Sequence, residues 1–223
     1  VGTIEATREL VKEGFTVLRL HCQETQVTTA LDGEGTPLPF KLEDAILSVT
    51  FPKALPKDVD AEVTVKYVST PTAGLYFHAP TAASPSTPRE MYSQGEGRDN
   101  RRWIPCYDES DDRSTVEIYA TVPASLETVG NGVLASSNVE KDGTRTDHWT
   151  LDRRIPSYLI SLIVGDMTTV RDAWEGVPLE YNGPAGREAE LCEGCSGTPA
   201  MMAFFSAYTG RKYPWPRYAQ TTV

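Results

Sequence analysis

Residues 133–151 read VLASSNVEKDGTRTDHWTL, which is two strand-like runs on either side of a tight turn. Asp142 and Gly143 are residue types that accept the positive φ angles of a sharp chain reversal. The segment therefore predicts an antiparallel hairpin between Val133–Val139 and residues 144–151.

The same alternation of apolar and polar residues recurs from the start of the chain to about residue 170. It is clear in Leu47, Val49 and Phe51, in Val63, Val65 and Tyr67, and in Val116, Ile118, Ala120 and Val122. Strand runs without long helical periods between them are typical of antiparallel sheets. We expect a mainly β fold whose sheets pack as a sandwich or saddle. Residues 158–164 would be apolar on both faces of a strand, so we expect a central strand buried on both sides.

The β pattern breaks at Gly183, Pro184 and Gly186. We place a domain boundary there, which gives a β-rich domain over residues 1–183 and the start of a second domain over residues 184–223. In the second part, Thr198 is expected to cap a helix that closes at Gly210. The apolar face of this helix is predicted to consist of Met201, Phe204, Phe205 and Tyr208. Two prolines then favour an extended segment over residues 218–223.

Composition narrows the possible partners. Hydrophobic residues make up 39% and charged residues 23% of the 223 positions, as in a globular protein with a core. The formal net charge is −10 and no basic cluster offsets it, so a nucleic-acid partner is not expected. No run approaches the roughly 20 apolar residues of a membrane-spanning helix. The compartment stays open.

Few residues suggest chemistry within the chain itself. His21, His78 and His148 are too far apart in sequence to form a zinc-binding pair on one helix, and we expect no metal ligands and no catalytic residue here. Cys192 and Cys195 form a C-x-x-C just ahead of the predicted helix, which leaves thiol redox chemistry as an alternative to an ordinary loop pair.

One cluster of side chains in the sequence is acidic. It consists of Asp108, Glu109, Asp111 and Asp112, and we expect a solvated turn rather than a cation site, because no calcium-loop template is present.

The most informative stretch is residues 91–112, MYSQGEGRDNRRWIPCYDESDD. Gln94 and Glu96 are two residues apart, which in an extended strand would place both side chains on one face. A carboxylate beside an amide oxygen suits a protonated amine, such as the free α-ammonium of a peptide. A surface strand that merely carries two polar residues stays open as the other interpretation.

The order of motifs resembles the aminopeptidase N family of zinc metallopeptidases, which are gluzincins. The family carries Gln-x-Glu, then Arg, then Pro-Cys-x-Asp, and here these are Gln94, Glu96, Arg101, Pro105, Cys106 and Asp108. Further matching stretches are GLYF at 74–77, NGVL at 131–134, YLISLIVGDM at 158–167, TPAMMAFFSAYTG at 198–210 and YPWPRYAQTTV at 213–223. The resemblance covers essentially the whole chain.

This resemblance implies a saddle-shaped N-terminal domain packed on a thermolysin-like α/β catalytic domain, which is truncated here. It assigns substrate binding to Gln94 and Glu96, which would hold the amine of peptides that have a free N-terminus. For Arg101, Cys106 and Asp108 we expect a structural role in a buried charge contact. A non-catalytic binding or scaffold protein of the same fold is the alternative.

The sequence also departs from the family pattern, because two of its motifs are missing. The sequence contains neither H-E-x-x-H nor G-x-M-E-N. Zinc is therefore expected in the full-length protein and not in this chain, which should be inactive alone. The first strands of the family's domain are expected to precede Val1.

Overall fold

A computed structural model of the chain describes residues 2–6, 15–56 and 60–223. The chain is mainly β, with 51% of residues in strands and 13% in helices, as the alternating sequence pattern predicts. The described residues group into two compact units. The first contains the described residues up to Tyr76 together with Ser93–Thr115 and Arg153–Ile160, and the second contains Phe77–Tyr92, Val116–Asp152 and Ser161–Val223.

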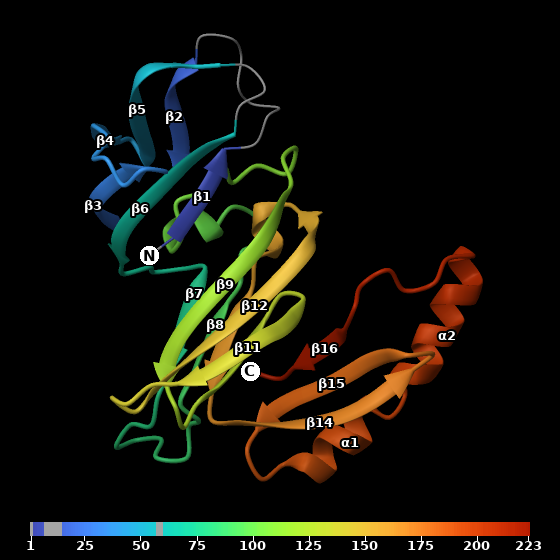
Figure 1. The fold of residues 1–223 in the computed structure, drawn as a ribbon. Coiled ribbons are helices and arrows are strands. Elements are labelled where there is room, and N and C mark those ends of the chain that lie inside the picture. The colour runs from blue at the N-terminus through green and yellow to red at the C-terminus, as the bar shows by residue number, and fades with distance from the viewer. Residues whose placement is uncertain (1, 7–14, 57–59) are drawn as a thin grey trace. The chain divides into compact units, whose positions relative to one another are not determined.

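The first unit holds two antiparallel three-stranded sheets (Figure 1). One has the order β1 (Gly2–Ala6), β6 (Ala61–Ser69), β3 (Thr25–Asp32), and the other has β2 (Phe15–His21), β5 (Ile46–Leu55), β4 (Phe40–Glu43). Their alternate apolar residues share one core that includes Leu18, Leu20, Ala30, Leu47, Val49, Val63 and Val65. This packing of two sheets confirms the sandwich expected for this part of the chain. The unit also contains two 3-10 helices, Asn100–Arg102 and Ser157–Leu159.

Most of the remaining strands lie in the second unit. A four-stranded sheet has the order β10 (Glu127–Gly130), β13 (Leu162–Gly165), β8 (Glu90–Ser93), β7 (Leu75–His78). The next has β11 (Val133–Val139), β12 (Thr144–Ile155), β9 (Ser114–Pro123), and the last has β14 (Met167–Trp174), β15 (Val177–Pro184), β16 (Tyr218–Thr221). Strands β7, β8, β9 and β12 each have residues in both units.

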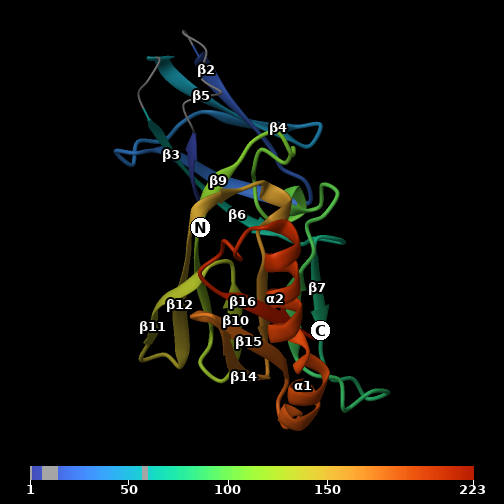
Figure 2. The ribbon, with the colours of Figure 1, turned by 90° about the vertical axis from the view of Figure 1, so that its right-hand side faces the viewer.

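Two helices pack on the last sheet, α1 (Glu188–Cys195) and α2 (Thr198–Thr209). In Figure 2, α2 lies on the viewer's side of this sheet and α1 lies below it. Their buried residues Leu191 and Met202 form a core with Leu179 and Tyr181 of β15. Strand β16 pairs parallel to β15, which confirms the extended segment expected after the two prolines.

The hairpin predicted from residues 133–151 is confirmed. Strands β11 and β12 pair antiparallel from Val133 opposite Thr150 to Val139 opposite Arg145. Gly143 has φ +86°, and the Asp142 carboxylate accepts the backbone N–H of Thr144 over 3.0 Å. The turn residues therefore act as their sequence indicates.

The strand expected over residues 158–164 is mostly wrong. Residues Ser157–Leu159 form a 3-10 helix, and only Leu162–Gly165 form a strand, β13. The Asn100 side chain donates hydrogen bonds to the backbone carbonyls of Ser157, just before this run, and of Ile160, within it. The part that does form β13 is central, because it lies between β10 and β8.

The helix expected after Thr198 is present, but two of its details differ. Gly197 is the N-cap, and the Thr198 hydroxyl donates to Oε1 of Gln220 over 2.9 Å. The helix buries Thr198 and Met202, one turn apart. The apolar residues of the predicted face are exposed instead: Met201 49%, Phe204 60%, Phe205 59% and Tyr208 79%. Gly210 closes the helix with φ +67°, as predicted.

The domain boundary at residue 183 stays a prediction. Strand β15 ends at Pro184 and pairs with both β14 and β16, so the break in the β pattern coincides with the end of a strand.

Candidate functional site

Gln94 and Glu96 lie in the turn that follows β8, and both are exposed. The backbone N–H of Gln94 donates to the Gly74 carbonyl over 2.9 Å, and the N–H of Glu96 donates to Oε1 of Gln94 over 2.9 Å. The extended strand expected for this pair is wrong, because β8 ends at Ser93 and this local hydrogen bond bends the chain. The two residues are nonetheless brought together.

The Glu96 carboxylate makes no ion pair with any residue that the structure describes. The Gln94 amide oxygen has one lone pair left after it accepts the Glu96 N–H. An exposed carboxylate and a neighbouring amide oxygen are thus both able to accept hydrogen bonds from a cation.

The loop is fixed by a buried ion pair between Arg101 and Asp108. Nε of Arg101 lies 3.0 Å from Oδ2 of Asp108, and Nη2 donates to the Asp108 carbonyl over 2.9 Å. The side chains are 15% and 1% exposed. The other carboxylate oxygen accepts the Ser157 hydroxyl over 2.9 Å. This confirms the structural charge contact expected for Arg101 and Asp108.

The acidic cluster is therefore not a solvated turn as a whole. Asp108 is buried in the ion pair, and Glu109 lies 2.8 Å from Nη2 of Arg98. Sequence spacing missed this arrangement because the arginines precede the carboxylates by seven or more residues and meet them only through the fold.

His21 belongs to the same cluster, although no sequence signal links it to the loop. Its Nδ1 accepts the backbone N–H of Asp108 over 3.1 Å. The backbones of His21 and Cys106 exchange hydrogen bonds of 2.8 and 3.1 Å. Burial, and then the positive charge of Arg101, lower the pKa of His21. The ring therefore favours the neutral form that leaves Nδ1 free to accept.

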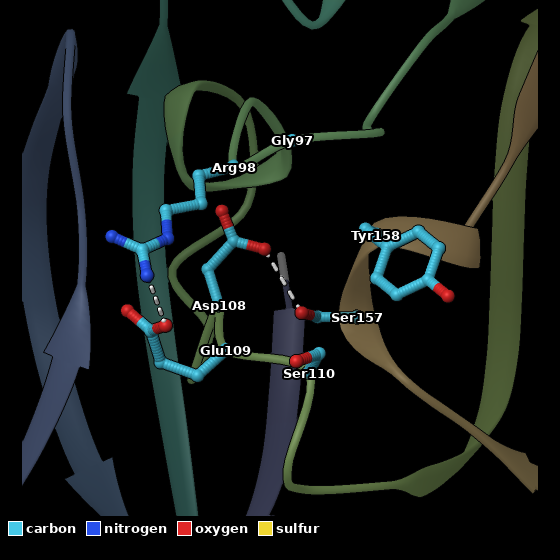
Figure 3. Close-up of a pocket in the computed structure, with 7 residues that line it drawn as sticks. All are labelled: Gly97, Arg98, Asp108, Glu109, Ser110, Ser157 and Tyr158. Carbon is cyan, nitrogen blue, oxygen red and sulfur yellow. Dashed lines mark hydrogen bonds and ion pairs between the residues drawn. The ribbon is translucent and has the colours of Figure 1, made fainter.

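A pocket of about 200 Å³ adjoins this cluster (Figure 3). It is lined by Gly97 and Arg98, by residues 108–110, and by Ser157 and Tyr158. Ser157 and Asp108 hydrogen-bond to each other at its wall, as do Arg98 and Glu109 at the opposite side. Four of the seven lining residues are therefore already paired with one another.

Metal ligands do not gather in the described part of the chain. Over residues 15–56 and 60–223, no three His, Cys, Asp or Glu side chains are arranged to hold an ion. The residues described therefore do not fit a zinc site. None of the described helices has the length and apolar character to cross a membrane.

The C-x-x-C pair lies within α1 and not in a loop ahead of a helix. Cys192 is exposed and Cys195 is the last residue of the helix. Both thiols are thus in the C-terminal half of α1. Cys22 lies in the core of the first unit and Cys106 is half-buried, and burial raises the pKa of both thiols.

Residues 1–159 match the family described as the Peptidase M1 N-terminal domain. The chain belongs to the M1 peptidase family. It is 29% identical over 150 residues to aminopeptidase N of Acetobacter pasteurianus, an alignment that covers 67% of this chain and 42% of that protein. The fold is similar to the M1 zinc metallopeptidase of Deinococcus radiodurans, with a TM-score of 0.76 and 22% identity over 95% of this chain and 49% of that one.

A variant of the Deinococcus M1 zinc metallopeptidase, solved with a Tyr-Ser-Ala substrate, has a TM-score of 0.75 to this chain and is 23% identical. These likenesses confirm the family expected from the motif order. This chain spans between 42% and 50% of the length of the relatives named above.

Proposed function

We propose that this chain forms part of a zinc-dependent aminopeptidase, and that the turn carrying Gln94 and Glu96 holds the free α-ammonium of the peptide substrate. Membership of the M1 family and the aminopeptidase relatives support the activity. The observation that carries the binding role is the exposed Glu96 carboxylate, which has no cationic partner among the described residues.

The chemistry of the turn fits an ammonium group. Glu96 would supply the negative charge, and the second lone pair of Gln94 Oε1 would accept one N–H, so two of the three ammonium donors would be paired. Holding the N-terminus in this way places the first peptide bond at a fixed distance from the anchor. An enzyme built like this removes residues singly from the N-terminus.

The rest of the active site would come from outside this sequence. The chain has no H-E-x-x-H motif, and none of its described residues form a metal site. We therefore infer that zinc and the groups that activate water belong to a catalytic domain on the same protein, and that this chain alone hydrolyses nothing.

The proposal is tested in the full-length enzyme with a panel of aminoacyl p-nitroanilides, with and without a zinc chelator. Chelator-sensitive release is expected for at least one amino acid. Glu96→Ala should lower kcat/KM by about 30- to 1000-fold, which corresponds to roughly 2–4 kcal/mol of lost transition-state binding.

The matched control is Glu34→Ala, which removes another exposed carboxylate from a loop of the same unit and should leave kcat/KM unchanged. Wild-type rates for Glu96→Ala would refute the binding role. No release from any substrate would instead favour a non-catalytic scaffold protein.

A further inference from the structure

We propose that Asn100 is a positioning residue, which holds the Gln94–Glu96 turn in the geometry that binds the substrate ammonium. This inference rests on the proposed function of that turn. Asn100 itself is fully buried and so would not touch the substrate.

The Asn100 amide connects two separate stretches of the first unit, Ser93–Thr115 and Arg153–Ile160. Its Nδ2 donates to the Ser157 carbonyl over 2.5 Å and to the Ile160 carbonyl over 3.1 Å. Its Oδ1 accepts the indole N–H of Trp103 over 2.8 Å. Both amide hydrogens and the oxygen are thus used, and a side chain bonded this fully at 0% exposure has one orientation.

The plane of this amide lies directly against Gly95, the residue between Gln94 and Glu96. A Cβ atom at position 95 would lie 2.3–2.5 Å from Oδ1, Cγ and Nδ2 of Asn100. Real Cβ atoms do not approach other atoms so closely, so only glycine fits there. The backbone N–H of Asp99 also donates to the Gly95 carbonyl, over 3.3 Å.

Through these contacts the Asn100 side chain supports the backbone of the turn at Gly95. The Gly95 backbone is buried against the amide, whereas Gln94 and Glu96 on either side are exposed. A change in the Asn100 side chain would therefore move both substrate-facing residues together. A displacement of about 1 Å in a positioned group is enough to lower the rate about 100-fold.

An asparagine meets these requirements where similar side chains do not. Aspartate has the same shape but would face the two carbonyl oxygens with a carboxylate oxygen instead of two N–H donors. Leucine would leave those carbonyls and the Trp103 N–H without partners in a buried site. Asn100→Asp therefore tests the hydrogen bonds with almost no change in volume.

The experiment measures how strongly the full-length enzyme prefers an inhibitor with an α-amine. The probes are L-phenylalanine hydroxamate and its des-amino analogue, 3-phenylpropanehydroxamate, and the readout is the ratio of their inhibition constants. We expect Asn100→Asp and Gly95→Ala each to lower the preference for the amine at least 10-fold. Gly95→Ala disturbs the same contact by adding a Cβ atom to the turn, and it leaves the hydrogen-bonding groups of Asn100 in place.

The control for a merely structural effect is Asn182→Ala. Asn182 is also buried, at 1% exposure, and hydrogen-bonds to Thr169 and Thr221 in the second unit. This variant should lower Tm without changing the inhibitor ratio. If Gly95→Ala or Asn100→Asp folds, lowers Tm and keeps the wild-type ratio, the positioning role is overturned.

Glu96→Ala separates this inference from the proposed function. If Glu96→Ala abolishes the preference for the amine and the Asn100 and Gly95 variants keep it, only the positioning role fails. If Glu96→Ala itself keeps the preference, the proposed function of the turn fails as well.

Discussion

The guanidinium carbon of Arg217 lies 4.8 Å from the ring centroid of Trp149, in a cation–π contact. The same guanidinium donates to the carbonyls of Gly132 and Gly130 over 2.8 and 2.7 Å and pairs with Glu180 at 2.6 Å. The side chain is 9% exposed. Arg217 therefore links β16 to the turn before β11, although 85 residues separate it from Gly132.

Replacing Arg217 with methionine should lower the free energy of unfolding by about 2–4 kcal/mol, because two carbonyls and one carboxylate lose a buried partner. Denaturation by guanidinium chloride measures the change. Arg171→Met is the control, since Arg171 approaches the same Glu180 carboxylate at 3.9 Å but is 75% exposed. Its effect should stay below about 0.5 kcal/mol, and equal losses in the two variants would contradict the assigned role.

Stability should depend on the protonation of His21. Its pKa is lowered from 6.5 by burial and by Arg101, so the unfolded chain binds the proton more readily than the folded chain. The stabilisation is complete above pH 6.5 and declines as the pH falls through the lowered pKa. Arg98 also disfavours the charged ring, whereas Glu109 and Asp108 favour it.

The variant His21→Asn keeps an oxygen acceptor for the Asp108 N–H but does not titrate. Urea midpoints at pH 8 and pH 5 should therefore differ less in the variant than in the wild type. An identical decline in both proteins would show that His21 does not cause the pH dependence.

The four thiols should differ in reactivity in the native protein. Cys192 is exposed, whereas Cys22 is 1% exposed, and burial raises the pKa of Cys106 well above its usual range. Iodoacetamide at pH 8 should therefore alkylate Cys192 first and spare Cys22 and Cys106, as measured by peptide mass spectrometry. All four should react in denaturant. Modification of Cys106 at the rate of Cys192 in the folded protein would be incompatible with this packing.

Local signals in the sequence were sufficient for the hairpin and the end of α2. Gly143 and Gly210 both have positive φ angles, the first in the hairpin turn and the second at the end of α2. Alternation likewise predicted the buried positions of β5 and β6, because Leu47, Val49, Val63 and Val65 face one core. In each case the information lies within a few residues of the element that forms.

Long-range contacts explain what the sequence did not reveal. The run at residues 158–164 has strand composition, but the carbonyl of Ile160 within it accepts a hydrogen bond from Asn100, 60 residues away. The apolar stripe of α2 is exposed because Thr198 and Met202 face the sheet instead. Gln94 and Glu96 were recognised by spacing and resemblance, whereas the Asn100 contact beneath them has no periodic signal.

The role proposed for Glu96 is to bind the α-ammonium of the substrate. The ratio of inhibition constants for the amino and des-amino hydroxamates measures this binding in the full-length enzyme. We expect the wild type and Glu34→Ala to prefer the amino compound and the preference to be at least 10-fold weaker in Glu96→Ala. An unchanged preference in a folded Glu96→Ala enzyme would contradict it.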